Sequence, residues 1–147
     1  MSSLPHPSEI DLATITGDAD ALHVIREPGI YKLFAHIRGV RGKRGIRVDA
    51  DNVTIDLHGH TLMGCEFSRD GIAVTDTAAN VRVQNGSVLA WGGVGVDLAN
   101  AINSDLVNVK VFDNVHGAVR LGAGAVLTDC VVGGDVRSGV SSFARSA

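Results

Sequence analysis

A phrase of one glycine followed by alternating apolar residues recurs along most of this chain of 147 residues. Its four copies are Gly45-Ile46-Arg47-Val48, Gly71-Ile72-Ala73-Val74, Gly95-Val96-Asp97-Leu98 and, with alanine in place of glycine, Ala118-Val119-Arg120-Leu121. The first apolar residues lie at positions 46, 72, 96 and 119, so the intervals are 26, 24 and 23 residues, and Val140 offers a fifth position. Repeats of this length are typical of solenoids, in which each repeat is one coil stacked on its neighbour.

Each repeat contains three short apolar runs separated by turns. In the first repeat the runs cover residues 46–48, 53–57 and 61–63, and the turns between them are rich in Asp, Asn, His and Gly. Period-two alternation predicts strands with one buried face, and the turn residues favour tight corners. No helical period is visible between residues 45 and 134. The sequence therefore predicts an all-β parallel β-helix of about 4–5 coils.

Turn residues at matching places in successive repeats suggest a ladder. Asn85, Asn108 and Asp129 occupy comparable turn positions, and His58 precedes Gly59 as Asn85 precedes Gly86. Stacked asparagines hydrogen-bond one another and tolerate a left-handed backbone. Ordinary turn chemistry is the alternative interpretation.

The chain divides into three segments by this pattern. Residues 1–27 are expected to form an N-terminal cap, residues 28–140 the β-helix and residues 141–147 a C-terminal tail. The last 15 residues, 133–147, are rich in Gly, Ser and Arg, which makes a poor cap for an apolar coil end. We therefore expect this end to be covered by another subunit or by further chain.

The segments Pro28–Tyr31 and 45–62 resemble the opening coils of right-handed parallel β-helix proteins of the pectate-lyase-like superfamily. That superfamily commonly shows a motif of the form NVTIDLNGHTL, and here Val53 to Leu62 follow it with His58 in place of the more usual asparagine. The resemblance implies a right-handed, single-stranded parallel β-helix. The superfamily includes polysaccharide lyases, glycoside hydrolases, esterases, phage tailspikes and adhesin-like proteins, and its enzymes generally have many more coils.

The outward side of the first strand in each repeat is the face on which to look for a site. One outward column contains Arg47, Ala73, Asp97 and Arg120, spaced by about 4.8 Å per coil. Asp97 and Arg120 are neighbours in this column and should lie about 5 Å apart on adjacent coils, so we expect a cross-strand ion pair between them. Asp49 lies in the next outward column.

These residues offer little for catalysis. Asp49 and Asp97 are expected about 12 Å apart, whereas glycosidase carboxylates lie within about 9.5 Å of each other. A lyase would need Arg120 or Arg47 as its base, with Asp97 holding Ca²⁺, although arginine normally stays protonated. Asp97 and Arg120 are thus the candidates for a catalytic role on this face.

Five residues are candidates for contacts to a polysaccharide: Arg47, Asp49, Asp97, Arg120 and Trp91. Trp91 is the single tryptophan and stands beside Gly92-Gly93. It could stack on a sugar, pack at a subunit contact or fill a corner of the core, and the sequence leaves all three open.

Charge and composition restrict the partners. The net charge of −3 and the few aromatic residues argue against binding to nucleic acid. The basic run from Arg38 to Arg47 is interpreted as a solvated loop, with an anion site as the alternative.

His58 and His60 lack a third ligand nearby, so we expect no metal and no cofactor. No apolar run is long enough for a membrane span and no secretory signal is visible, so the default expectation is a cytoplasmic protein without a membrane partner.

We therefore expect a non-catalytic β-helix module for oligomeric assembly, carbohydrate contact or both. A homo-oligomer is expected, with a trimer favoured by the resemblance. The alternative is a small polysaccharide lyase-like enzyme that acts on an acidic polysaccharide.

Overall fold

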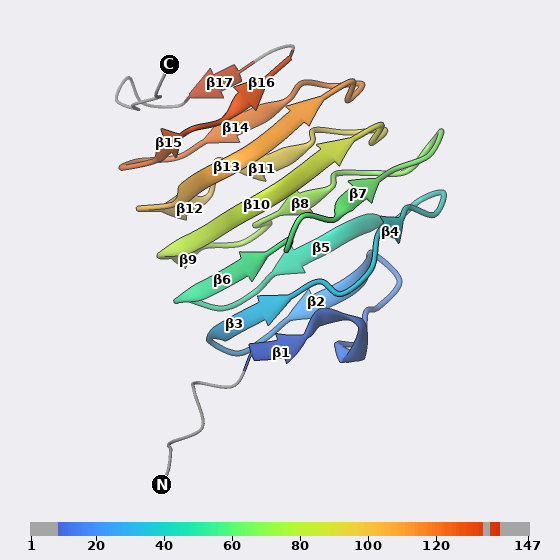
Figure 1. Cartoon of the computed structure of the whole chain (residues 1–147), viewed down its shortest axis with the longest axis horizontal. Coiled ribbons are helices and arrows are strands. Elements are labelled where there is room, and N and C mark those ends of the chain that lie inside the picture. Colours follow the sequence, from blue (N-terminus) through green and yellow to red (C-terminus); the bar gives the residue numbers. More distant parts are fainter. Residues whose placement is uncertain (1–8, 134–135, 139–147) are drawn as a thin grey trace, which may run out of the picture.

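The structure, a computed structural model, describes residues 9–133 and 136–138 of the chain. These residues form an all-β solenoid in which parallel strands stack in about five turns (Figure 1). The prediction of a parallel β-helix architecture is confirmed at this level. A 3-10 turn, η1 (Leu12–Thr14), interrupts the strands near the start, and none of the described residues forms a helix long and apolar enough to cross a membrane.

Two large parallel sheets form the walls of the solenoid, and a small third sheet lies at one corner. The first wall has nine strands: β1, β3, β6, β10, β13 and β15 pair in that order, β7 pairs with β10 and with β4, and β16 pairs with β13. Its strands are β1 (Glu9–Asp11), β3 (Gly29–Lys32), β4 (Ile37–Arg38), β6 (Val53–Asp56), β7 (Thr61–Met63), β10 (Val81–Leu89), β13 (Asp105–Phe112), β15 (Val126–Thr128) and β16 (Val131–Val132).

The second wall has six strands in the order β17, β14, β11, β8, β5, β2. They are β2 (Ala21–Ile25), β5 (Arg44–Val48), β8 (Ile72–Ala73), β11 (Val96–Leu98), β14 (Val119–Leu121) and β17 (Val136–Ser138). The third sheet pairs β9 (Ala78–Ala79) with β12 (Ala101–Ile102).

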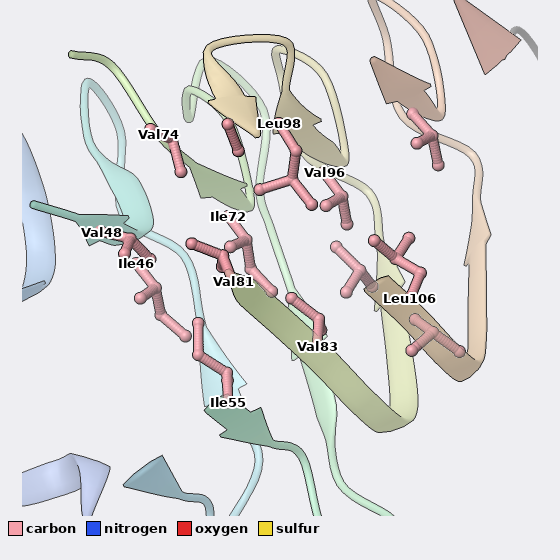
Figure 2. Close-up of a cluster of buried hydrophobic side chains, with 14 of the residues drawn as sticks. Ile46, Val48, Ile55, Ile72, Val74, Val81, Val83, Val96, Leu98 and Leu106 are labelled. Atoms are coloured by element: carbon pink, nitrogen blue, oxygen red, sulfur yellow. The ribbon is translucent and has the colours of Figure 1, made fainter. Parts of the chain in front are cut away.

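The strand register stacks the repeated apolar residues as the sequence predicts. Ile46 pairs with Ile72, Ile72 with Val96, and Val96 with Val119, and all four side chains are fully buried. Figure 2 shows Ile46, Ile72 and Val96 following one another through the core, opposite residues of the nine-stranded wall. Burial of one such row per strand is the main stabilising term of the stack.

The six-stranded wall extends beyond the four repeats at both ends. Val119 pairs with Val136, so Val136 continues the row after an interval of 17 residues. The fifth position expected at Val140 and the tail 141–147 lie outside the described residues. At the other end β2 pairs with β5, and β1 pairs with β3. The sheets thus begin within the segment 1–27.

Left-handed residues mark the corner that divides the nine-stranded wall. His58, Asn85, Asn108 and Asp129 have φ angles between 53° and 64°. The Asn108 side-chain amide donates to the Asn85 side-chain oxygen at 3.1 Å, which confirms the predicted ladder at this step. Asparagine adopts this backbone region more readily than most residues, so each repeat can turn here without glycine.

A second ladder, which the sequence analysis did not identify, marks the corner before β6, β10 and β13. Asn52, Asn80 and Asn103 have φ angles of 57°, 61° and 58°. The Asn80 amide donates to the Asn52 side-chain oxygen at 2.9 Å. Asparagine at matching repeat positions was the signal for it.

Candidate functional site

The outer face of the six-stranded wall carries the column of residues predicted from the repeats. Arg47 lies beside Ala73, Ala73 beside Asp97, and Asp97 beside Arg120 in the strand register. The order of this column is thus the one expected from the sequence, and Asp49 follows Arg47 by two residues. Ala73 is buried and separates the charged groups at the two ends of the column.

Arg47 is held by three carboxylates at once. Its Nη2 lies 2.8 Å from Oδ2 of Asp18, its Nη1 lies 2.9 Å from Oδ2 of Asp20, and its Nε donates to Asp49 Oδ2 at 3.1 Å. The Arg47 side chain is only 16% exposed. Its guanidinium donors are thus already used within the chain.

The same acidic segment also binds a second arginine. Arg44 contacts Asp20 through Nη1, and its Nε donates to Asp70 Oδ2 at 3.1 Å. Arg69 contacts Asp20 as well. We call the set Asp18, Asp20, Arg44, Arg47, Asp49, Arg69 and Asp70 the arginine–aspartate cluster. It joins the segment before β2 to the coils of β5 and β8.

The two aspartates of this cluster that precede β2 were not predicted from the sequence. Asp18 and Asp20 lay in the segment assigned as a cap, so neither was matched to the strand of Arg47. Their separation was the available signal, because Asp20 precedes Arg47 by 27 residues and Arg44 precedes Asp70 by 26, close to one repeat. Opposite charges one repeat apart become neighbours on adjacent coils.

The cluster shifts the protonation of its members. A hydrogen bond from Arg47 lowers the pKa of Asp18 to about 2. Burial alone would raise the pKa of Asp20, but hydrogen bonds from Arg47 and Arg44 outweigh it and lower that pKa. Hydrogen bonding to Asp49, followed by the bonds to Asp20 and Asp18, raises the pKa of Arg47 above its usual value. A group in this state cannot give up its proton near neutral pH.

We expect the cluster to make stability fall in acid. Because the folded pKa values of Asp18 and Asp20 are below the unfolded value, their contribution is present above about pH 4 and is lost as the pH falls through the folded pKa values, that of Asp18 being about 2. Urea unfolding measured from pH 7 to pH 2 checks this. Arg47→Gln is the control: its unfolding midpoint should fall less steeply below pH 4 than that of the parent. Equal slopes in the two proteins would show that the cluster does not set the acid response.

Asp97 and Arg120 form the expected ion pair. Arg120 Nη1 lies 3.2 Å from Asp97 Oδ2, and the side chains are 48% and 18% exposed. A pair this open to water contributes about 0–1 kcal/mol. The Asp97 carboxylate also accepts a hydrogen bond from the Ala99 backbone N–H at 3.2 Å. These two residues are near each other and accessible, but each already has a partner.

Asp49 borders a shallow hollow at the end of this face. The hollow has a volume of about 380 Å³ and is lined by Arg47, Asp49, Thr75, Asp76 and Thr77. Asp76 and the two threonines are exposed. Carboxylate and hydroxyl oxygens dominate its wall, so it suits a cationic or hydroxyl-rich group.

Trp91 is not on the surface, and its prediction as a polysaccharide contact is wrong. The side chain is fully buried, and its Nε1–H donates to the Leu62 carbonyl at 3.2 Å. Its ring therefore has no free face for a sugar or a subunit. Of the three possibilities that the sequence left open, the structure selects the core corner.

Glycines make the space that Trp91 fills. A Cβ added at any of four glycines would lie within 3.0 Å of Trp91 atoms; these are Gly39, Gly45, Gly64 and Gly71. Two of the four are the glycines that open the repeated phrase. The close approach of the Trp91 indole thus explains in part why Gly45 and Gly71 have no side chain.

The histidines noted in the sequence lie together on the nine-stranded wall. The His58 and His60 rings are 6.0 Å apart, and His36 approaches His60 at 5.1 Å. His36 Nδ1 accepts a hydrogen bond from the Thr61 backbone N–H, which occupies one of its nitrogens. Among the described residues no three His, Cys, Asp or Glu side chains are placed to hold a metal ion.

Comparison with protein-family models, with curated proteins and with solved structures finds no match for this chain.

Proposed function

We propose that this chain is a short, non-catalytic parallel β-helix module that serves in oligomeric assembly. In this proposal the solenoid is a right-handed member of the pectate-lyase-like type that the motif at residues 53–62 resembles. The main support is the state of the charged face: Arg47 is bound by three carboxylates, and Arg120 is paired with Asp97.

Lyase chemistry is poorly served by this arrangement. A base must be able to lose its proton, whereas the surrounding carboxylates raise the pKa of Arg47. A calcium ion takes six or more oxygens, and on this face Asp97 is bound to Arg120 rather than grouped with other carboxylates. The candidate catalytic pair is better explained as a surface ion pair between coils.

Assembly is supported by strand edges and apolar surface at the last coil. Among the described residues β15 and β16 each pair on one side only, with β13. Val126 and Val131 in these strands are 38% and 60% exposed. An open edge with apolar side chains tends to associate unless something covers it. We propose a homo-oligomer, with a trimer favoured by the resemblance.

Carbohydrate contact is part of the same proposal, with the hollow beside Asp49 as its place. The hydroxyls of Thr75 and Thr77 and the carboxylate of Asp76 could hydrogen-bond sugar hydroxyls there. Trp91 takes no part.

A lyase assay separates this proposal from the enzyme alternative. We expect no rise in the ultraviolet absorbance of unsaturated products when the protein is incubated with polyuronates, with or without Ca²⁺. Arg120→Ala should behave like the parent. A rise that the parent shows and Arg120→Ala loses would refute the non-catalytic assignment and place the base at Arg120.

A further inference from the structure

Two loops project side by side from one edge of the solenoid. They are residues 39–43, between β4 and β5, and residues 64–71, between β7 and β8, seen at the right of Figure 1. The Gly42 N–H donates to the Phe67 carbonyl at 2.8 Å, and the Arg69 N–H donates to the Lys43 carbonyl at 2.9 Å. The loops therefore support each other and present one formed surface.

Phe67 lies on this surface with a strained, left-handed backbone conformation. Its φ is 65°, and it is the third residue of a turn closed by the Ser68 N–H on the Cys65 carbonyl at 3.0 Å. Glycine or asparagine normally takes such a position, since a bulky side chain is strained there. Its side chain is nonetheless 62% exposed and lies against the Arg41 guanidinium, 4.8 Å from the ring centroid. Backbone strain of this kind occurs mostly at functional sites, and aromatic residues are enriched at protein interfaces.

Three cations lie in or next to the 39–43 loop, and one of them, Arg41, contacts the Phe67 ring. Arg38, Arg41 and Lys43 make no ion pair in the part of the chain that the structure describes, in contrast to Arg44 and Arg47 of the same basic run. Glu66 adds one exposed negative charge. We call the surface of Arg38, Val40, Arg41, Lys43 and Phe67 the loop edge. Its formal charge stays positive with Glu66 included.

The opposite edge of the same wall is acidic. The strands β5 and β8 begin at the loop edge and end at the turns that follow them, so these turns lie about one strand length away. The turns carry Glu27, Asp49, Asp51 and Asp76, together with Arg26 and Arg47. We call this surface, which includes the hollow beside Asp49, the turn edge. Glu27 and Asp76 are exposed and form no ion pair within the described part of the chain.

We propose that the loop edge of one copy docks on the turn edge of a second copy. Arg41 and Lys43 face Asp76 and the rim of the hollow, and Phe67 packs against that rim. The charges are complementary, and a protruding surface meets a recessed one. The contact joins different surfaces of the two copies, so it closes into a ring if the rotation permits. This inference rests on the proposed role in assembly and names the surfaces that perform it.

Charge exchange tests the contact directly. We expect the double variant Arg41→Glu, Lys43→Glu and the single variant Asp76→Arg each to raise the dissociation constant of the oligomer at least tenfold in 50 mM NaCl, as measured by sedimentation velocity. A chain that combines Arg41→Glu with Asp76→Arg should recover much of the affinity, because the same pair is restored with the charges reversed. Raising NaCl to 500 mM should weaken the parent oligomer as well.

Phe67→Gly separates binding from folding. The change relieves the left-handed strain, so its melting temperature should equal or exceed that of the parent while the oligomer weakens. Glu66→Gln in the same turn is the matched control and should not weaken the oligomer.

Two results would overturn the inference. If the parent is an oligomer that neither charge variant weakens, the copies meet elsewhere, for example at the last coil, and the assembly role stands. If the parent is a monomer, both the contact and the assembly role are wrong, and binding of anionic lipid vesicles through the loop edge would then give that surface a different partner.

Discussion

Replacing Trp91 with alanine should destabilise the protein by about 3–5 kcal/mol. The side chain is fully buried, donates a hydrogen bond to Leu62, and occupies space that four glycines leave for it. Alanine would leave a cavity that the surrounding coils cannot close, because each is fixed by hydrogen bonds to its neighbours. A loss of this size is a large share of the roughly 5–15 kcal/mol that stabilises a domain. Urea unfolding followed by circular dichroism measures it.

Trp91→Phe is the matched variant for this experiment. It keeps an aromatic ring in the corner but loses the outer part of the indole and the Nε1 donor, so we expect a smaller loss than with alanine. If Trp91→Ala were no less stable than the parent, the indole could not be a core residue. Its burial at this corner would then be incorrect.

Gly45→Ala should cost about 2–3 kcal/mol although it adds only one methyl group. The new Cβ would lie 2.6 Å from the Gly71 carbonyl oxygen on the next coil and 2.8 Å from Cη2 of Trp91. Neither neighbour can move freely, since the oxygen accepts a backbone hydrogen bond and the indole is enclosed by the core. Thermal or urea unfolding gives the change in free energy.

Gly42→Ala is the control, because a Cβ there meets nothing within 4 Å. Its φ of 79° still makes alanine unfavourable by about 1 kcal/mol, so the two variants differ by the clash. In a Trp91→Phe background the cost of Gly45→Ala should be smaller, as the outer ring atoms are gone. Equal costs at Gly42 and Gly45 would contradict the close contact.

The repeat predicted the fold well because its period determines which residues pair on neighbouring coils. Equal places in the phrase put Ile46, Ile72, Val96 and Val119 in one buried row, and the outward residue between two apolar ones then follows from alternation. The pairing of Asp97 with Arg120 was predictable for the same reason. Both statements need only the spacing of residues along the chain.

Contacts that long side chains make with other coils could not be predicted from the repeat spacing. Trp91 donates to Leu62, 29 residues earlier, so its indole extends across coils toward glycines that the pattern assigns to other repeats. Two of the three partners of Arg47, Asp18 and Asp20, lie next to strand β2, which has a weaker alternation than the later repeats. The strain at Phe67 has no sequence signal, because a turn of this kind is normally recognised by glycine or asparagine.

The mass of the chain in solution tests the proposed role most directly. Light scattering coupled to size-exclusion chromatography, at micromolar concentration and low salt, should give a stable multiple of the mass of one chain, with a trimer as the expected species. A mass equal to one chain across that concentration range would contradict the account, because an assembly module must associate under the conditions in which its charged edges are least screened.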